Sequence, residues 1–141
     1  MKKNLFALCM LLFVCTLALL CSCCAEDAES SVEVIKDSSY FSDYSVEGES
    51  VAIKCIVTLK NKSDTAAVFE IYGDFSADKG TLLTDGVLKG ADAVSCDGSF
   101  TLRPNEEKTF TVIFSGTFAG TDQKKDRMLP EITVKSPNEN R

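Results

Sequence analysis

The chain has 141 residues, a length typical of one domain. It carries 15 lysine and arginine against 21 aspartate and glutamate side chains, a net charge of −6, and a chain this acidic repels nucleic-acid phosphates. There is no histidine, which removes the usual general base near neutral pH and the commonest metal ligand. We therefore expect a protein that binds no nucleic acid, needs no metal or cofactor and is not an enzyme.

The first residues have the pattern of a secretory signal peptide. Lys2 and Lys3 give a short positive start, and residues 5–21 contain Thr16 as their one polar side chain. A basic start followed by an apolar stretch is typical of an export leader. Because this stretch is shorter than the roughly 20 residues of a spanning helix, we predict a removable signal peptide over residues 1–22. An uncleaved membrane anchor is the alternative.

The end of this leader, Leu20-Cys21-Ser22-Cys23, resembles the lipobox of bacterial lipoproteins. A lipobox has an aliphatic residue, a variable one, a small one and then the cysteine that is modified. The resemblance implies a diacylglyceryl thioether on Cys23, cleavage just before it, and attachment to the extracytoplasmic face of a membrane. The alternative is ordinary cleavage after Ala25, which would give a soluble secreted protein.

A polar, acidic run follows the lipobox, and we predict that residues 23–31 are the lipidated cysteine and its tether. Loss of Lys2 and Lys3 with the leader leaves 13 basic against 21 acidic side chains, a net charge of −8. The eight residues 24–31 span at most roughly 28 Å when fully extended. The tether therefore holds the folded domain close to the membrane surface.

Beyond the tether, apolar and polar residues alternate in several segments, as in half-buried β-strands. Val32 and Val34 flank a glutamate, and residues 51–60 alternate over a long stretch. Turn-forming residues at 61–64 separate this stretch from a second alternating segment at 67–73. We expect these two segments to form a hairpin.

Further strands are expected at 93–96, 100–102, 108–118 and 132–134. The stretch 74–90 holds three glycines and short apolar pairs, which predicts loops with one or two brief strands. Strands separated by Gly, Asn and Asp, with no amphipathic helix, indicate an all-β domain built as an antiparallel sandwich. We place this domain at residues 32–136 and a polar tail at 137–141.

Residues 100–112, Phe-Thr-Leu-Arg-Pro-Asn-Glu-Glu-Lys-Thr-Phe-Thr-Val, resemble a signature of bacterial immunoglobulin-like surface modules. In that signature, F-x-L-x-P-(G/N)-E … F-x-V, a strand ends at a proline turn and the next core strand returns. The resemblance implies an immunoglobulin-like β-sandwich of about seven strands. It also implies extracellular binding or spacing, with no particular ligand.

Cys55 and Cys96 are the two cysteines of the predicted domain. Outside the cell they could pair, closing a loop of about 40 residues. The alternative is that Cys55, which lies on the apolar face of its strand, is a buried free thiol that packs as a small hydrophobe. A catalytic thiol is not expected, because no histidine is available to activate it.

Two further clusters are candidate contact surfaces. Tyr40, Phe41 and Tyr44 lie among Ser and Asp residues and predict an exposed aromatic patch for a partner, or else aromatic packing over an open end of the sandwich. Lys124, Lys125 and Arg127 form the one basic cluster, which would contact anionic lipid or else be a solvated loop.

Several aspartates lie in the predicted loops: Asp74, Asp78, Asp85, Asp92 and Asp97. Their spacing does not match a calcium-binding loop of the D-x-D-x-D-G type, so we interpret them as turn-forming residues and predict no metal site.

Together these features predict a non-catalytic lipoprotein of the cell envelope that binds an envelope protein or polysaccharide, or acts as a spacer. A small secreted hydrolase and a soluble secreted inhibitor or effector are the alternatives.

Overall fold

The computed structural model describes residues 31–121 and 126–137. The predicted signal peptide, Cys23 and nearly all of the tether lie outside these ranges, as do Lys124 and Lys125. Within the described part of the chain, no helix is long and apolar enough to cross a bilayer.

Eight strands make up the described domain, and they confirm the all-β prediction. The strands are β1 (Val32–Val34), β2 (Tyr40–Glu47), β3 (Ser50–Asn61), β4 (Ala67–Asp74), β5 (Val87–Asp92), β6 (Phe100–Leu102), β7 (Glu107–Thr117) and β8 (Glu131–Lys135). Two single 3-10 turns, η1 (Lys36–Ser38) and η2 (Ser76–Asp78), complete the regular structure.

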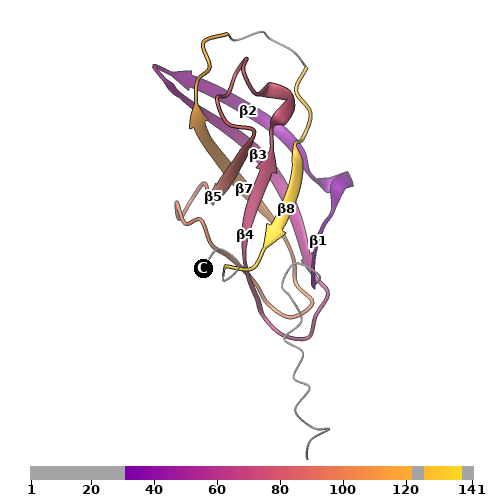
Figure 1. Ribbon diagram of the computed structural model, residues 1–141. Helices are drawn as coiled ribbons and strands as arrows, with labels where there is room; N and C mark the ends of the chain where they lie inside the picture. Colours follow the sequence, from indigo (N-terminus) through magenta and orange to yellow (C-terminus); the bar gives the residue numbers. More distant parts are fainter. Residues whose placement is uncertain (1–30, 122–125, 138–141) are drawn as a thin grey trace, which may run out of the picture.

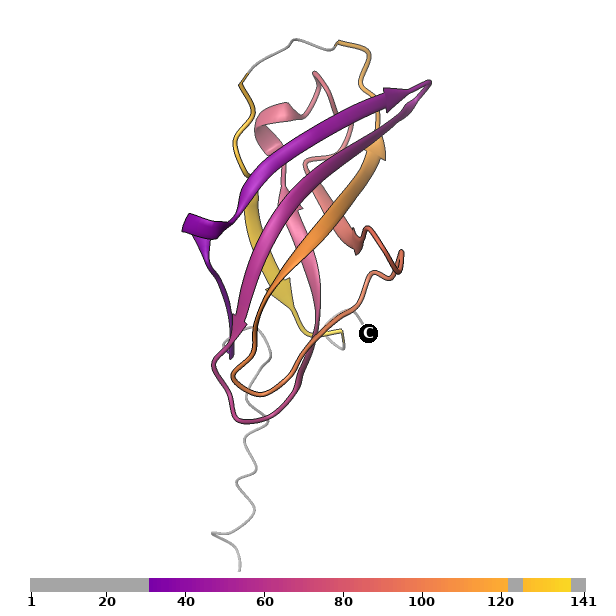
Figure 2. The same ribbon diagram turned by 180° about the vertical axis from the view of Figure 1, so that it is seen from behind.

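All pairings between these strands are antiparallel, and they join the strands into one sheet that folds over on itself in a barrel-like form (Figures 1 and 2). In one layer β3 pairs with β7 along its length, while β1 and β2 lie end to end on its other edge. In the facing layer β4 pairs with β8 and β6. The strand β5 links the layers, because its first half pairs with β4 and its second half with β7.

The core lies between these layers and is built by the alternation seen in the sequence. Every second residue of β3, from Val51 to Leu59, is at most 1% exposed. Further core side chains come from β7, β4 and the loop before β5, among them Phe114, Phe69 and Leu82. Burial of one face of each long strand explains why the alternating segments form strands.

Two glycines allow β5 to cross between the layers. A Cβ atom on Gly90 would lie 2.5 Å from Val112 Cγ1, and a Cβ atom on Gly73 of β4 would lie 2.7 Å from Phe75 Cε2. Both positions also lie against the ring of Phe114, at 3.0 and 3.1 Å from its Cε1 atom. No side chain fits at either position, so the close approach of these strands depends on glycine.

Two sequence predictions are wrong in detail, and one strand was not predicted. The segments 51–60 and 67–73 do not form a hairpin, because β3 pairs with β7 while β4 lies in the other layer. Residues 93–96 form a turn instead of a strand, since the Asp92 carboxylate accepts the N–H groups of Val94 and Ser95. The sequence analysis also missed β2.

The long strand β3 sets the two ends of the domain. Its last residues, from Leu59 to Asn61, pair with β1, where the described chain begins, and we call this the entry end. Ser50, its first residue, pairs with Thr117 at the opposite end, which we call the far end. The strand has 12 residues, so about eleven steps of about 3.3 Å from Ser50 to Asn61 separate the two ends by about 36 Å. Figure 1 shows the segments that follow β7 and precede β8 at the far end.

Candidate interaction surfaces

The three aromatic residues of β2 do not all lie on the same face of the strand. Phe41 and Tyr44 lie opposite Cys55 and Ile53, so both face the core, and their ring centroids are 6.3 Å apart. A register shift between Phe41 and Asp43 brings the two rings to the same side of the strand. Tyr40 faces the other way and is 57% exposed. The three rings therefore do not form one exposed patch: Tyr40 is exposed, whereas Phe41 and Tyr44 are partly buried against the core.

Arg127 is held inside the far end and is not part of an exposed basic loop. Its side chain is 7% exposed, and its guanidinium lies over the ring of Tyr44, 4.7 Å from the centroid. Nη1 of Arg127 donates a hydrogen bond to the Asp78 carboxylate. The arginine thus connects β2, η2 and the segment that leads into β8. The grouping of Arg127 with Lys124 and Lys125 as a lipid-facing surface is corrected by these contacts.

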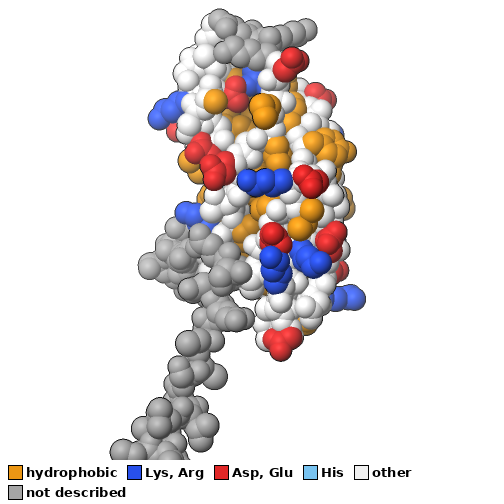
Figure 3. Space-filling model, turned by 90° about the vertical axis from the view of Figure 1, so that its right-hand side faces the viewer, with side chains coloured by type: hydrophobic (Ala, Val, Ile, Leu, Met, Phe, Trp, Pro, Cys, Tyr) orange, Lys and Arg blue, Asp and Glu red, His pale blue; other side chains and the backbone are white. Residues whose placement is uncertain are grey.

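Two hollows flank the segment that leads into β8. The first, which we call the seam groove, has a volume of about 530 Å³ and lies between the layers. It is lined by Val34, Lys36, Ser39 and residues 128–132. The second, which we call the acidic hollow, has a volume of about 370 Å³ and is lined by Asp74, Phe75, Ala77, Asp78 and residues 126–131. Figure 3 shows this side of the molecule, with a band of hydrophobic side chains between charged ones.

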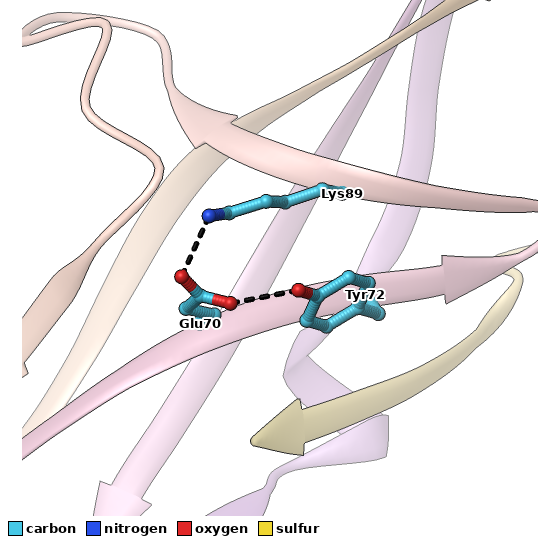
Figure 4. A network of polar contacts seen from close by, with 3 residues as sticks. All are labelled: Glu70, Tyr72 and Lys89. Carbon is cyan, nitrogen blue, oxygen red and sulfur yellow. Dashed lines mark hydrogen bonds and ion pairs between the residues drawn. The ribbon is translucent and has the colours of Figure 1, made fainter. Parts of the chain in front are cut away.

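The outer surface of β4 carries a network of polar contacts (Figure 4). Lys89 Nζ of β5 donates to Glu70 Oε1 at 2.6 Å, and the Tyr72 hydroxyl donates to Glu70 Oε2 at 2.7 Å. These two bonds, from Lys89 first and Tyr72 second, lower the pKa of Glu70. Lys135 of β8 lies over the Tyr72 ring, 5.3 Å from its centroid. The Glu70 carboxylate ties β4 to β5, and the contact of Lys135 with Tyr72 adds β8. A carboxylate kept ionised with both oxygens bound is a poor candidate for a general acid.

The two cysteines of the domain are not paired. Cys55 is buried in the core, whereas Cys96 is exposed in the turn after β5, with a φ of 61°. Of the two alternatives that the sequence left open for Cys55, a disulfide with Cys96 or a buried free thiol, the structure has the buried free thiol. Burial raises the pKa of the Cys55 thiol to about 12, which leaves almost no reactive thiolate near neutral pH.

We expect the two thiols to react with iodoacetamide at rates that differ by a factor on the order of 100 or more, because only an accessible thiolate is alkylated. In the native protein Cys96 is modified promptly, and Cys55 is modified only after denaturation. Mass spectrometry of the peptides that contain each cysteine measures both rates, and replacing Cys96 with serine provides the control. A disulfide-linked peptide, or equal rates in the native protein, would contradict this arrangement.

The loop aspartates act mainly on the local backbone. Asp74 accepts the N–H of Ser76 at 2.8 Å, and Asp92 accepts the N–H groups of Val94 and Ser95 at 2.8 and 3.0 Å. These bonds are those of turn-forming aspartates, as predicted for both residues. In residues 31–121 and 126–137, no group of three or more acidic or cysteine side chains is arranged to hold a metal ion.

The far end thus combines a buried arginine with the acidic hollow, and the seam groove extends from there toward β1. Sequence reasoning found none of the three. Their residues come from four distant segments of the chain, so no local pattern marks them. Comparisons of the chain with protein-family models, with curated proteins and with solved structures found no match.

Proposed function

We propose that this protein is an exported lipoprotein of the bacterial envelope, anchored through a lipid on Cys23 to the extracytoplasmic face of a membrane. Its folded part serves as a non-catalytic binding or spacer module for an envelope protein or polysaccharide. The observation that carries the proposal is the lipobox-like Leu20-Cys21-Ser22-Cys23 at the end of an apolar leader. A β-domain begins nine residues later, at Val32, as expected for a short tether.

The proposed module is an immunoglobulin-like sandwich. Support comes from two facing antiparallel layers, one built on β3 and β7 and the other on β4 and β8, with β5 shared between them. The proline turn of the resemblance, at Pro104 and Asn105, lies between β6 and β7. The Glu106 carboxylate of that turn accepts the Arg103 N–H at 2.7 Å, so it closes the turn on itself.

The positions of the two ends favour a partner that lies away from the membrane. A tether that leads from Cys23 to β1 approaches the entry end, and the far end lies about 36 Å from it. At the far end, the Thr121 N–H donates to the Thr81 carbonyl, and Asp126 lines the acidic hollow. Anionic lipid of the anchoring membrane is therefore a less suitable partner for the far end than another envelope component.

Replacing Cys23 with alanine tests the anchor. In cells fed an alkyne-tagged fatty acid, we expect the label on the wild-type protein and on a Cys24→Ser control, and at least a tenfold loss of label from Cys23→Ala. The mass of the N-terminal peptide identifies the cleavage site. Undiminished label on Cys23→Ala, or a mature chain that starts at Glu26, would overturn the lipoprotein proposal.

A further inference from the structure

The segment before β8 exposes apolar surface that the domain core does not use. Met128 is 87% exposed, and with Leu129 and Pro130 it forms the wall shared by the seam groove and the acidic hollow. Phe75, which is 4% exposed, also lines the acidic hollow. Apolar side chains gathered at a concave site are typical of contact surfaces, and methionine adapts its shape to a partner.

The charges around this hollow are strongly unequal. Four carboxylates line it, from Asp74, Asp78, Asp126 and Glu131, together with one cation, Arg127. Arg127 pairs with Asp78. Among the described residues no ion pair reaches the other three carboxylates, so the hollow keeps an excess of negative charge.

Two of these carboxylates oppose each other across a strand pair. Asp74 of β4 and Glu131 of β8 are register partners, and like charges at such positions destabilise a sheet. Hydrogen bonds from the Ser76 hydroxyl and N–H lower the pKa of Asp74, which therefore remains charged at neutral pH. On the same surface Glu70 lies opposite Lys135, and opposite charges at paired positions stabilise a sheet. The acidic pair is thus an exception on this surface and lies where the hollow opens.

We propose that the acidic hollow binds a lysine or arginine side chain of a basic segment of a partner protein. The cationic head lies among Asp74, Asp126 and Glu131, and the aliphatic stem packs on Met128 and Phe75, as long cationic side chains do at apolar surfaces. A volume of about 370 Å³ accommodates one such side chain with part of its backbone. The inference rests on the proposed function, since it specifies the partner of the same module.

The test is fluorescence anisotropy at low salt, with the full-length protein in a non-ionic detergent and a labelled nine-residue peptide of alternating leucine and lysine. We expect saturable binding that the double substitution Asp74→Asn/Glu131→Gln weakens at least tenfold. The charge-matched control, Asp64→Asn/Asp97→Asn, removes two exposed carboxylates that do not line the hollow and changes binding less than twofold. The hollow variant unfolds at the same or a higher temperature than wild type, because a repulsive pair is removed.

Several results would overturn the proposal. Equal loss of binding in the two double variants means that the peptide is attracted to the acidic protein in general and not to the hollow. Equal binding of a leucine–glutamate peptide means that opposite charge is not the basis of peptide binding. Absence of peptide binding to the wild-type protein overturns it as well. If the peptide then binds only to Lys124→Gln/Lys125→Gln, the chain's own lysines take the place of the partner, and the proposed partner is ruled out. None of these results depends on the lipid on Cys23, so the anchor and the hollow fail separately.

Discussion

Replacing Phe114 with alanine is expected to lower the free energy of unfolding by about 3–5 kcal/mol, the range for emptying a buried phenylalanine site. The side chain is 0% exposed, and its ring meets the edge of Phe75 with centroids 5.2 Å apart. It also covers Gly73 and Gly90, which have no side chains to move into the space left behind. Because such a cavity collapses poorly, the loss should fall near the upper end of the range.

Urea denaturation followed by far-ultraviolet circular dichroism measures this loss in a chain without tryptophan. Phe114→Leu should lose less than Phe114→Ala, because leucine fills part of the volume. The adjacent Ser115 is exposed, so Ser115→Ala should stay within about 0.5 kcal/mol of wild type. A loss below about 1 kcal/mol for Phe114→Ala would mean that the contact of β7 with both glycines contributes little to stability.

The sequence predicted most clearly the strands that bury one face without interruption. β3 buries every second residue from Val51 to Leu59, β4 from Ala67 to Gly73 and β7 from Phe110 to Phe114, so the period of two is visible without knowledge of their neighbours. The pairing of β3 was not predictable in this way. After a strand and a turn, the chain can either pair back on that strand as a hairpin or cross to the other layer. The two cases differ only in contacts between residues that are far apart in sequence.

The strand β2 escaped prediction because its period is broken. Its inward side chains are Phe41, Tyr44 and Val46, and the register shift after Phe41 inserts an extra residue between the first two. Edge strands also bury little, so polar residues such as Ser42 and Asp43 dominate the local pattern. An irregular edge with few apolar residues resembles a loop when only the sequence is examined.

Arg127, which lines the acidic hollow, shows the same limit of local sequence patterns. Its charge and its neighbours in sequence suggest a solvated basic loop. The side chain is instead buried by Asp78, which is 49 residues away, and by Tyr44 of β2. A local pattern holds no information on contacts of that range.

A second large loss of stability is expected at the entry end, from Asn61. This residue is 0% exposed, and its Nδ2 donates to the carbonyls of Thr65 and Arg103 at 2.7 and 3.0 Å. Its Oδ1 accepts the Ser63 N–H at 3.0 Å. One side chain thus joins the turn after β3 to the turn after β6. We expect Asn61→Ala to lower the free energy of unfolding by about 2–4 kcal/mol, because buried backbone groups lose their partners.

Asn61→Asp separates hydrogen bonding from volume. Aspartate has nearly the shape of asparagine but places an oxygen against the two carbonyls, so it should destabilise the protein at least as much as alanine does. Lys62→Ala is the control: its ion pair with Glu33 joins two side chains that are 56% and 49% exposed, and exposed pairs contribute roughly 0–1 kcal/mol. The same denaturation experiment ranks the three variants. If Asn61→Asp matched wild type, the donated bonds would be dispensable, and the packing of β3 against β7 would have to hold the entry end by itself.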